Sequence, residues 1–243
     1  MDYWGLKEKK GIVLDFDGTI CHLFSGFDLQ STIHYLKIKL DPLGVSFDNN
    51  YDAFDVFDVI RNQLVDSKQL ESAFIVADEV LRQAEMNAIE TCTIIDHSAE
   101  FISILLHEGY KVGISTNNSS ECVLKLICNH MLKNSTINKV SNNFVSAFKS
   151  IPICGRVGAH PELMKPNPWS LLQVANEMDL SIKDICFIGD SLRDYEAAVA
   201  ADCQFIAFGP TARKKERFKT KMEERLIITN YEDLIAIVQT HFA

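Results

Sequence analysis

The sequence predicts an α/β protein with a doubly wound parallel sheet and an inserted α-helical cap. Two observations predict the sheet: short apolar runs end in small polar or acidic residues, and helical patterns lie between the runs. A third observation predicts an inserted all-helical module, because the stretch 24–91 carries helical patterns but no convincing buried strand. Such alternation is typical of a sheet whose strands are covered on both faces by helices.

Five apolar runs of three or four residues are the candidate strands, and they are 12–14, 112–114, 185–188, 205–208 and 226–228. The first run is followed directly by Asp15, the second by Ser115 and the third by Gly189. Short apolar runs with small or acidic residues at their ends fit buried parallel strands.

Helical patterns separate these runs in the second half of the chain. The segment 97–107 places Phe101, Ile104 and Leu105 on one face, and Gly109 can end this helix. Serine is a good residue to cap a helix start, and proline suits the first helical position. On these signals the later helices begin at or near Ser119, Pro168, Ser191 and Tyr231.

The inserted segment is predicted to contain three helices, at 28–40, 51–65 and 68–90. In the third, apolar residues from Phe74 to Ala88 recur at steps of three and four, which indicates packing against other helices. The chain is thereby divided into a core of residues 1–23 and 92–243 and a helical cap of residues 24–91.

The composition limits the classes of function. Lys and Arg total 24 against 33 Asp and Glu, so the formal net charge of −9 argues against general binding of nucleic acid or anionic lipid. The N-terminal MDYWGLKEKK lacks the apolar core of a secretory signal, and no run of about 18 apolar residues predicts a membrane span. Seven irregularly spaced cysteines without a CxxC pair fit free thiols in a cytoplasmic protein. The oligomeric state is left open.

The stretch VLDFDGTI at 13–20 ends an apolar run in two carboxylates, Asp15 and Asp17. In an extended chain residues i and i+2 point to the same side, where like charges repel unless a cation or a proton relieves them. Ligands of open parallel sheets bind outside the carboxyl ends of the strands. The residues expected to converge in that crevice are Asp15, Asp17, Thr116, Asp190 and Asp194, and several carboxylates in one place favour Mg²⁺.

Four motifs together resemble those of the haloacid dehalogenase superfamily of phosphohydrolases. They are DFDGT at 15–19, the strand that ends in Thr116, Lys165 in MKPNP, and GDSLRD at 189–194. The motifs occur in the order of that family, and the insertion lies where the family places a helical cap. The stretch GRVGAHPELMKPNP resembles phosphoglycolate-phosphatase-like members, although VAADCQ has Asp202 where their usual pattern has glycine.

The resemblance implies a Rossmann-type core and Mg²⁺-dependent hydrolysis of a small soluble phosphomonoester. Asp15 would be the nucleophile, since a carboxylate can attack phosphorus and form an aspartyl-phosphate. Asp190 and the Asp15 carboxylate would ligate Mg²⁺, and the resemblance adds the backbone carbonyl of Asp17. The Asp17 side chain would then serve as general acid and base. An acidic residue at this position favours phosphate esters over dehalogenase or phosphonatase substrates.

Other residues of the motifs are expected to hold the phosphoryl group. Thr116 offers its hydroxyl and Asn117 its backbone N–H, Lys165 supplies positive charge, and Gly18 lets the backbone pass close to the phosphate. Asp194 would orient Lys165 or a water molecule.

Three points stay open in the sequence. A phosphomutase would share every core residue, and a regulatory protein could bind phosphate without turnover. The sequence does not identify the substrate, although the cap is expected to select it. Further candidates for the crevice are Lys37, Lys39, Arg61 and Lys68 in the cap, and Arg156 and His160 before the lysine motif.

Overall fold

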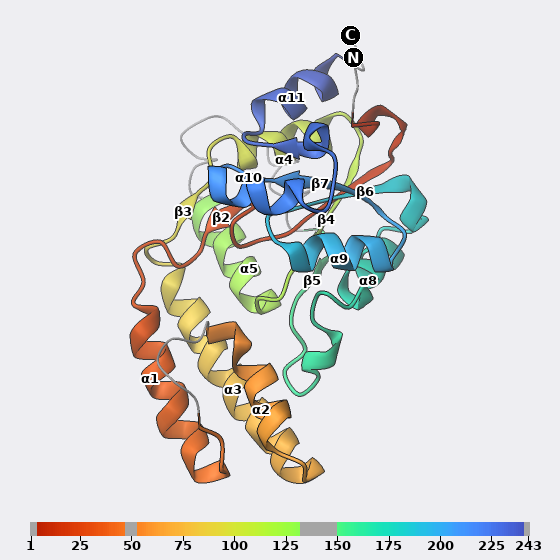
Figure 1. The fold of residues 1–243 in the computed structure, drawn as a ribbon. Helices are drawn as coiled ribbons and strands as arrows, with labels where there is room; N and C mark the ends of the chain where they lie inside the picture. The colour runs from red at the N-terminus through yellow and green to blue at the C-terminus, as the bar shows by residue number, and fades with distance from the viewer. Residues whose placement is uncertain (1–3, 47–52, 132–149, 241–243) are drawn as a thin grey trace.

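The centre of the molecule is a six-stranded parallel sheet in the order β5–β4–β1–β6–β7–β8. The computed structural model describes residues 4–46, 53–131 and 150–240 (Figure 1). The strands are β1 (Gly11–Leu14), β4 (Lys111–Ser115), β5 (Ile153–Cys154), β6 (Ile185–Gly189), β7 (Gln204–Phe208) and β8 (Ile227–Ile228). All five predicted strands are present. The sixth strand of this sheet, β5, has only two residues and is too short to leave a pattern in the sequence.

The strand order reverses direction at β1, which lies between β4 and β6. Leu14 aligns with Ile114 on one side and with Ile188 on the other. The residues that follow these three strands therefore emerge side by side at one edge of the sheet, which is where ligands bind in such folds.

Helices cover both faces of the sheet (Figure 1). One face packs against α4 (Ser98–His107), α5 (Ser120–Leu126) and α11 (Glu232–Gln239), and the other against α8 (Trp169–Glu177), α9 (Leu192–Ala200) and α10 (Ala212–Lys219). Neighbours along β1 alternate between the two apolar clusters, because Ile12 and Leu14 join the first and Val13 joins the second. The predicted α/β class with a parallel sheet covered by helices is confirmed.

The helix starts follow the capping signals of the sequence. Ser119 accepts a hydrogen bond from the backbone N–H of Cys122, and Ser191 forms a reciprocal capping box with Asp194. Helix α8 begins at Trp169, one residue after the predicted start. Helix α10 was missed because its sequence ARKKERFK is almost entirely polar and only Phe218 is buried.

Asp202, at the glycine position of the family pattern, has a left-handed backbone with φ of 56°. Aspartate is one of the few non-glycine residues that adopt this conformation routinely. Its side chain also forms an ion pair with Lys183. The departure from the family pattern therefore leaves the turn after α9 intact.

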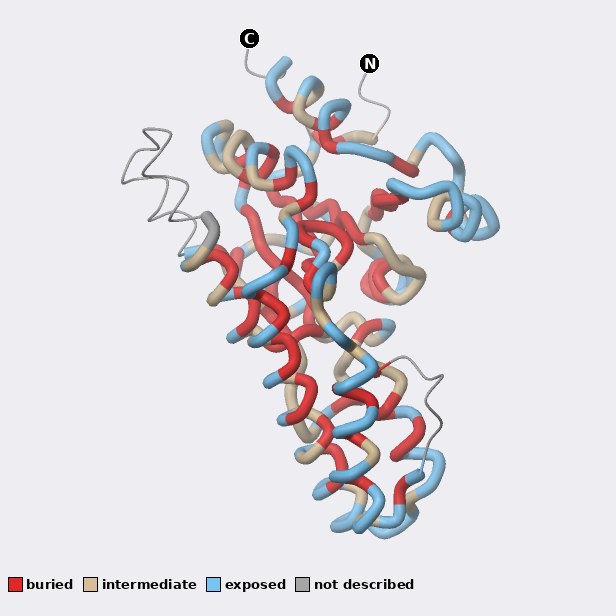
Figure 2. The backbone as a smooth tube through the Cα atoms, turned by 90° about the vertical axis from the view of Figure 1, so that its left-hand side faces the viewer, coloured by how far each residue is buried: buried red, intermediate tan, exposed pale blue. Residues whose placement is uncertain are grey.

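Three helices pack around a separate apolar cluster in the segment predicted to be the cap, and they are α1 (Leu29–Leu40), α2 (Val56–Gln63) and α3 (Ser67–Ala88). Figure 2 shows them as an extension below the sheet, with buried residues along their inner sides. Asp28 and Asp66 cap the starts of α1 and α3. The second helix is shorter than the predicted 51–65, because a 3₁₀ turn at Ala53–Asp55 precedes it, and residues 51–52 lie outside the described residues.

The chain passes between the sheet and these helices through a small antiparallel pair of strands. Strand β2 (Cys21–His22) leads toward α1, and β3 (Thr93–Ile94) returns from α3. Helix α3 is shared, because its last residue, Ala88, and the following Ile89 pack in the cluster beneath the sheet. The domain boundaries themselves stay a prediction.

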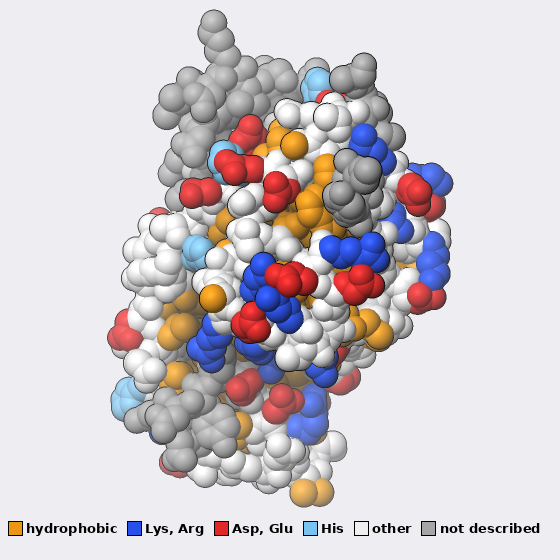
Figure 3. Space-filling view, turned by 45° about the horizontal axis from the view of Figure 1, so that its top comes forward, with side chains coloured by type: hydrophobic (Ala, Val, Ile, Leu, Met, Phe, Trp, Pro, Cys, Tyr) orange, Lys and Arg blue, Asp and Glu red, His pale blue; other side chains and the backbone are white. Residues whose placement is uncertain are grey.

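The surface and the cysteines add little to the account of function. All seven cysteines are free thiols. Within the described ranges, no helix combines the length and the apolarity needed to cross a bilayer. On the face in Figure 3, acidic and basic side chains are interspersed, with hydrophobic side chains between them.

Candidate active site

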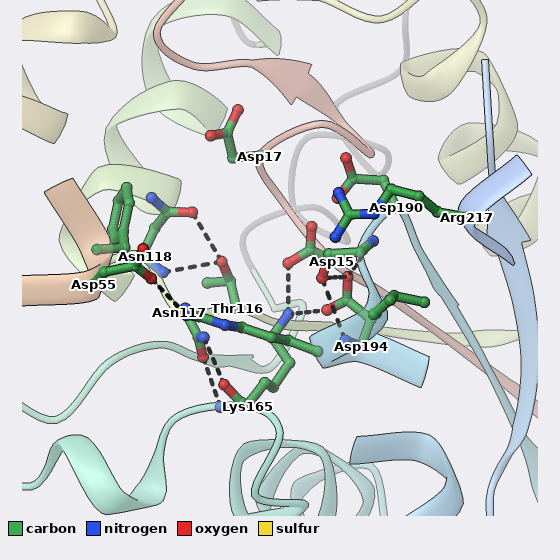
Figure 4. A pocket seen from close by; sticks show the side chains of 14 residues that line it. Asp15, Asp17, Asp55, Thr116, Asn117, Asn118, Lys165, Asp190, Asp194 and Arg217 are labelled. Atoms are coloured by element: carbon green, nitrogen blue, oxygen red, sulfur yellow. Dashed lines mark hydrogen bonds and ion pairs between the residues drawn. The ribbon is translucent and has the colours of Figure 1, made fainter. Parts of the chain in front are cut away.

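A cavity of about 380 Å³ opens at the carboxyl ends of β1, β4 and β6. Asp15 directly follows β1, Thr116 follows β4 and Asp190 follows β6. The cavity is lined by every predicted site residue except Gly18, namely Asp15, Asp17, Thr116, Asn117, Lys165, Asp190 and Asp194 (Figure 4). Residues from distant parts of the chain are thus brought together, as expected from their positions at the carboxyl ends of parallel strands.

Lys165 is buried at the centre of this group. Its Nζ lies 2.6 Å from Oδ1 of Asp15 and 2.6 Å from Oδ1 of Asp194, and donates to the carbonyl of Ser115 at 2.9 Å. Burial alone lowers the pKa of Lys165, but the two carboxylates outweigh burial and the pKa lies above its usual value. Lys165 therefore keeps its positive charge inside the cavity.

The lysine loop is held in place by the side chain of Asn117. Its Oδ1 accepts a hydrogen bond from the backbone N–H of Lys165 at 2.8 Å, and its Nδ2 donates to the Lys165 carbonyl at 3.0 Å. The sequence assigned only the backbone N–H of Asn117 to the site. The side-chain role was missed because a pair of residues 48 positions apart leaves no local pattern.

Three carboxylates form a compact group in which oxygens of Asp15, Asp190 and Asp194 lie within 4.8 Å of one another. Burial, followed by the charge of Asp194, raises the pKa of Asp15 to about 7 and that of Asp190 to about 6. The raised pKa values mean that the charged forms of these carboxyl groups are destabilised here unless a further cation binds. Hard oxygen donors in this arrangement fit a divalent ion such as Mg²⁺.

Asp190 is fixed by two neighbours. Its Oδ2 forms an ion pair with Lys214 of α10, a residue that the sequence did not assign to the site because α10 itself was missed. Gly18 has a positive φ of 87°, and a side chain there would overlap the Asp190 carboxylate. In this structure Gly18 leaves room for Asp190, whereas the sequence assigned that room to the phosphate.

Asp17 is separate from the three-carboxylate group, and its side chain points away from Asp15 and Asp190 (Figure 4). Its Oδ1 accepts a hydrogen bond from the backbone N–H of Leu23 at 2.9 Å. Burial raises the pKa of Asp17 to about 6, although the Leu23 hydrogen bond opposes this. A carboxyl group with such a pKa can donate and accept a proton near neutral pH.

The hydroxyl of Thr116 is engaged within its own loop. It donates to Oδ1 of Asn118 and accepts from the Asn118 backbone N–H, both at 3.1 Å. The hydroxyl must turn away from Oδ1 of Asn118 before it can donate to a phosphoryl oxygen. Thr19, the last residue of DFDGT, donates to Oδ2 of Asp15 at 3.3 Å and helps to orient that carboxylate.

The helical segment predicted to be the cap reaches the cavity through Phe54 and Asp55. Nη2 of Arg193, in the first turn of α9, lies 2.9 Å from Oδ1 of Asp55 and joins the two sides of the cavity. This pair spans 138 positions, so no local pattern in the sequence indicates it. None of the four candidate contacts in the cap lines this cavity. Arg61 lines a neighbouring cavity, and Lys37, Lys39 and Lys68 line neither of the two.

Arg156 and His160 also lie outside this cavity. The side chain of Arg156 is fully buried and forms ion pairs with Glu85 at 2.8 Å and Asp78 at 2.6 Å, both on α3. His160 is paired with Glu162 at 2.9 Å near the surface. These two candidates therefore do not line the cavity, because acidic partners hold each of them elsewhere.

The comparisons with known proteins agree with the motifs. The model of the haloacid dehalogenase-like hydrolases matches residues 9–202. That match covers most of the chain, so the protein belongs to this family of hydrolases, and the predicted family is confirmed. A search of curated proteins finds no match.

Solved structures share the fold at low sequence identity. A haloacid dehalogenase-superfamily hydrolase from Ehrlichia chaffeensis is 18% identical with a TM-score of 0.56, over 97% of this chain and 98% of that one. A protein from Haemophilus somnus described as a predicted phosphoglycolate phosphatase is 18% identical with a TM-score of 0.58, over 96% and 99%. CbbY from Rhodobacter sphaeroides, solved in complex with phosphate, is 16% identical with a TM-score of 0.51, over 82% and 86%.

The pKa shifts predict how Mg²⁺ should affect stability. The pKa of Asp15 rises from 3.8 to about 7, so the folded state binds the proton of this carboxyl group more tightly than the unfolded chain does. Without metal, tighter proton binding stabilises the folded state at low pH. The free energy of unfolding should therefore fall as the pH rises through that range. Mg²⁺ would bind the deprotonated carboxylates. At 100-fold excess over its Kd it should raise Tm by about 5–10 °C at pH 8, and by much less at pH 5.

Thermal unfolding with Mg²⁺ and with EDTA at the two pH values measures this difference. Asp190→Asn should reduce the Mg²⁺-dependent shift at pH 8, whereas Asp184→Asn, at a partly exposed site beside Lys10, should leave it unchanged. Equal shifts at pH 5 and pH 8 would contradict the assignment of the carboxylate group.

Proposed function

We propose that the protein is a Mg²⁺-dependent phosphatase that hydrolyses a small soluble phosphomonoester. One observation carries the proposal: Asp15 lies 2.6 Å from the buried, charged Lys165, within a group of three carboxylates that fits a divalent cation. When bound, Mg²⁺ would be held by Asp15, Asp190 and the backbone of Asp17, and it would neutralise and orient the phosphoryl group.

In the first step a carboxylate oxygen of Asp15 attacks phosphorus while the bond to the leaving oxygen breaks. Asp17 gives its proton to the leaving oxygen, and an aspartyl-phosphate remains on Asp15. Lys165 stabilises the negative charge that develops on the phosphoryl oxygens and holds Asp15 in position. Thr19 restricts the rotation of Asp15 through its hydrogen bond.

In the second step Asp17, now deprotonated, takes a proton from water. The resulting hydroxide attacks phosphorus, the bond to Asp15 breaks, and phosphate leaves with the carboxylate of Asp15 restored. The raised pKa of Asp17, about 6, suits a group that must work in both directions. The phosphate in the related CbbY structure and the description of the Haemophilus somnus protein support this choice of substrate class.

A colorimetric assay tests the proposal. The wild-type protein should release phosphate from p-nitrophenyl phosphate with Mg²⁺, and EDTA should stop the release. Lys165→Met should lower kcat by about 10²–10³-fold, because it removes the cation from the cavity. Absence of phosphate release from p-nitrophenyl phosphate and from a panel of phosphorylated metabolites, all with Mg²⁺, would contradict the proposal.

A further inference from the structure

A second cavity of about 420 Å³ adjoins the first one. The two share Phe54, Lys165 and Arg193 among their lining residues, so they meet beside the catalytic lysine. The second cavity lies between the cap, at Phe54 to Arg61, and the loop that carries the lysine motif, 161–167. We call it the outer cavity.

The walls of the outer cavity carry several apolar surfaces. From the cap come Phe54 and Phe57, and from the lysine loop come Met164 and two prolines, Pro161 and Pro166. Phe57 is held by its neighbours, since its ring centroid lies 6.1 Å from that of Phe74 and 5.9 Å from the Arg156 guanidinium carbon. Phe54 and Met164 are partly exposed, and an aromatic ring and a thioether are good partners for the face or edge of another ring, whereas Phe57 is 2% exposed and lies behind them in the wall.

The charged groups of the outer cavity are already paired with groups of opposite charge. Arg61 lies 3.1 Å from Asp58, and Arg193 lies 2.9 Å from Asp55. The remaining anion, Glu162, is paired with His160. A second anionic group on the substrate would compete with these carboxylates for the arginines, whereas a neutral ring can stack on the guanidinium planes without weakening the ion pairs.

We propose that the outer cavity binds the leaving group of the substrate, and that this leaving group is a neutral alcohol carrying a ring. The inference rests on the proposed phosphatase activity. With the phosphoryl group bound at Asp15 in the first cavity, the remainder of the substrate extends past Phe54 and Arg193, which line both cavities. The ring then lies between the cap and the lysine loop, so the cap selects the substrate by this contact.

Two alkyl phosphates with the same type of leaving oxygen provide the test. Propyl phosphate and 3-phenylpropyl phosphate differ only in the ring, so chemistry at phosphorus is matched. For the wild type, kcat/KM should be about 10–100-fold higher for the phenyl compound, as expected for burial of one aromatic ring. A third ester, 4-phosphooxybutanoate, carries a carboxylate in place of the ring and should gain nothing over propyl phosphate.

Variants connect the preference to the cavity. Phe54→Ala should lower the ratio of the two kcat/KM values toward one, and Met164→Ala should lower it as a second, independent change. The matched control is Tyr35→Ala, which removes an exposed aromatic ring of α1 that lines neither cavity. The control should keep the wild-type ratio of the two kcat/KM values. A general loss of activity lowers both values equally and leaves this ratio unchanged.

The outcomes separate the two proposals. Equal kcat/KM for propyl and 3-phenylpropyl phosphate, or a preference for 4-phosphooxybutanoate, would overturn the ring-binding role and leave the phosphatase activity standing. A ratio unchanged in both Phe54→Ala and Met164→Ala would also overturn it. If none of the esters is hydrolysed and p-nitrophenyl phosphate is not hydrolysed either, the proposed function itself fails.

Discussion

Replacing Asp15 with asparagine should lower kcat for phosphate release by about 10⁴-fold or more, because an amide oxygen cannot replace the attacking carboxylate. The fold should survive this change. The environment raises the pKa of Asp15 to about 7, so a charge at this position is unfavourable without metal. The Tm of Asp15→Asn at pH 8 in EDTA should therefore not fall below that of the wild type.

The matched control is Asp184→Asn, which makes the same chemical change at a site beside Lys10 and outside the cavity. It should retain the wild-type kcat. Full turnover by Asp15→Asn would show that another group attacks phosphorus. A loss of kcat accompanied by a collapse of Tm would show that the role of Asp15 is structural.

Replacing Glu85 with alanine should lower the free energy of unfolding by about 3 kcal/mol, because it leaves a buried guanidinium with one anionic partner fewer. Glu85 and Arg156 both have fully buried side chains, 2.8 Å apart. Glu85 also accepts hydrogen bonds from Nδ2 of Asn118 at 3.2 Å and from the backbone N–H of Ser119 at 3.0 Å. Its loss therefore disturbs the loop that follows Thr116 as well.

Urea denaturation at pH 7 measures the change. Asp78→Ala should cost less, since its side chain remains 23% exposed and solvent replaces part of the interaction. The double variant Glu85→Gln with Arg156→Met should be more stable than the sum of the two single losses implies, because neither charge remains buried alone. Strictly additive losses would contradict the description of these residues as a coupled pair.

The sheet could be predicted because its strands are buried on both faces and leave uninterrupted apolar runs. The runs at 12–14 and 185–188 correspond to β1 and β6 almost residue for residue. Strand β5 could not be predicted, because two residues carry no periodicity. Helix α10 was hidden for the opposite reason, since its single buried side chain, Phe218, gives no apolar stripe.

The candidate site was predictable where polar residues follow strands directly. Asp15, Thr116 and Asp190 each stand at such an end, and the parallel register carries them to one edge. The remaining contacts join segments far apart in the chain and depend on how helices and loops pack. The pair of Asp55 and Arg193 is an example, because it forms only when a turn of the cap lies against α9.

The central claim is that Asp15 bonds covalently to phosphorus, and trapping the intermediate tests it most directly. The Asp17→Asn variant should be mixed with p-nitrophenyl phosphate and Mg²⁺, because p-nitrophenolate leaves without a proton but water is no longer activated. After quenching and reduction with borohydride, which converts an acyl phosphate to an alcohol, peptide mass spectrometry should find homoserine in place of Asp15. Reduction at a different carboxylate, or a burst of p-nitrophenolate with an unmodified Asp15, would contradict the mechanism.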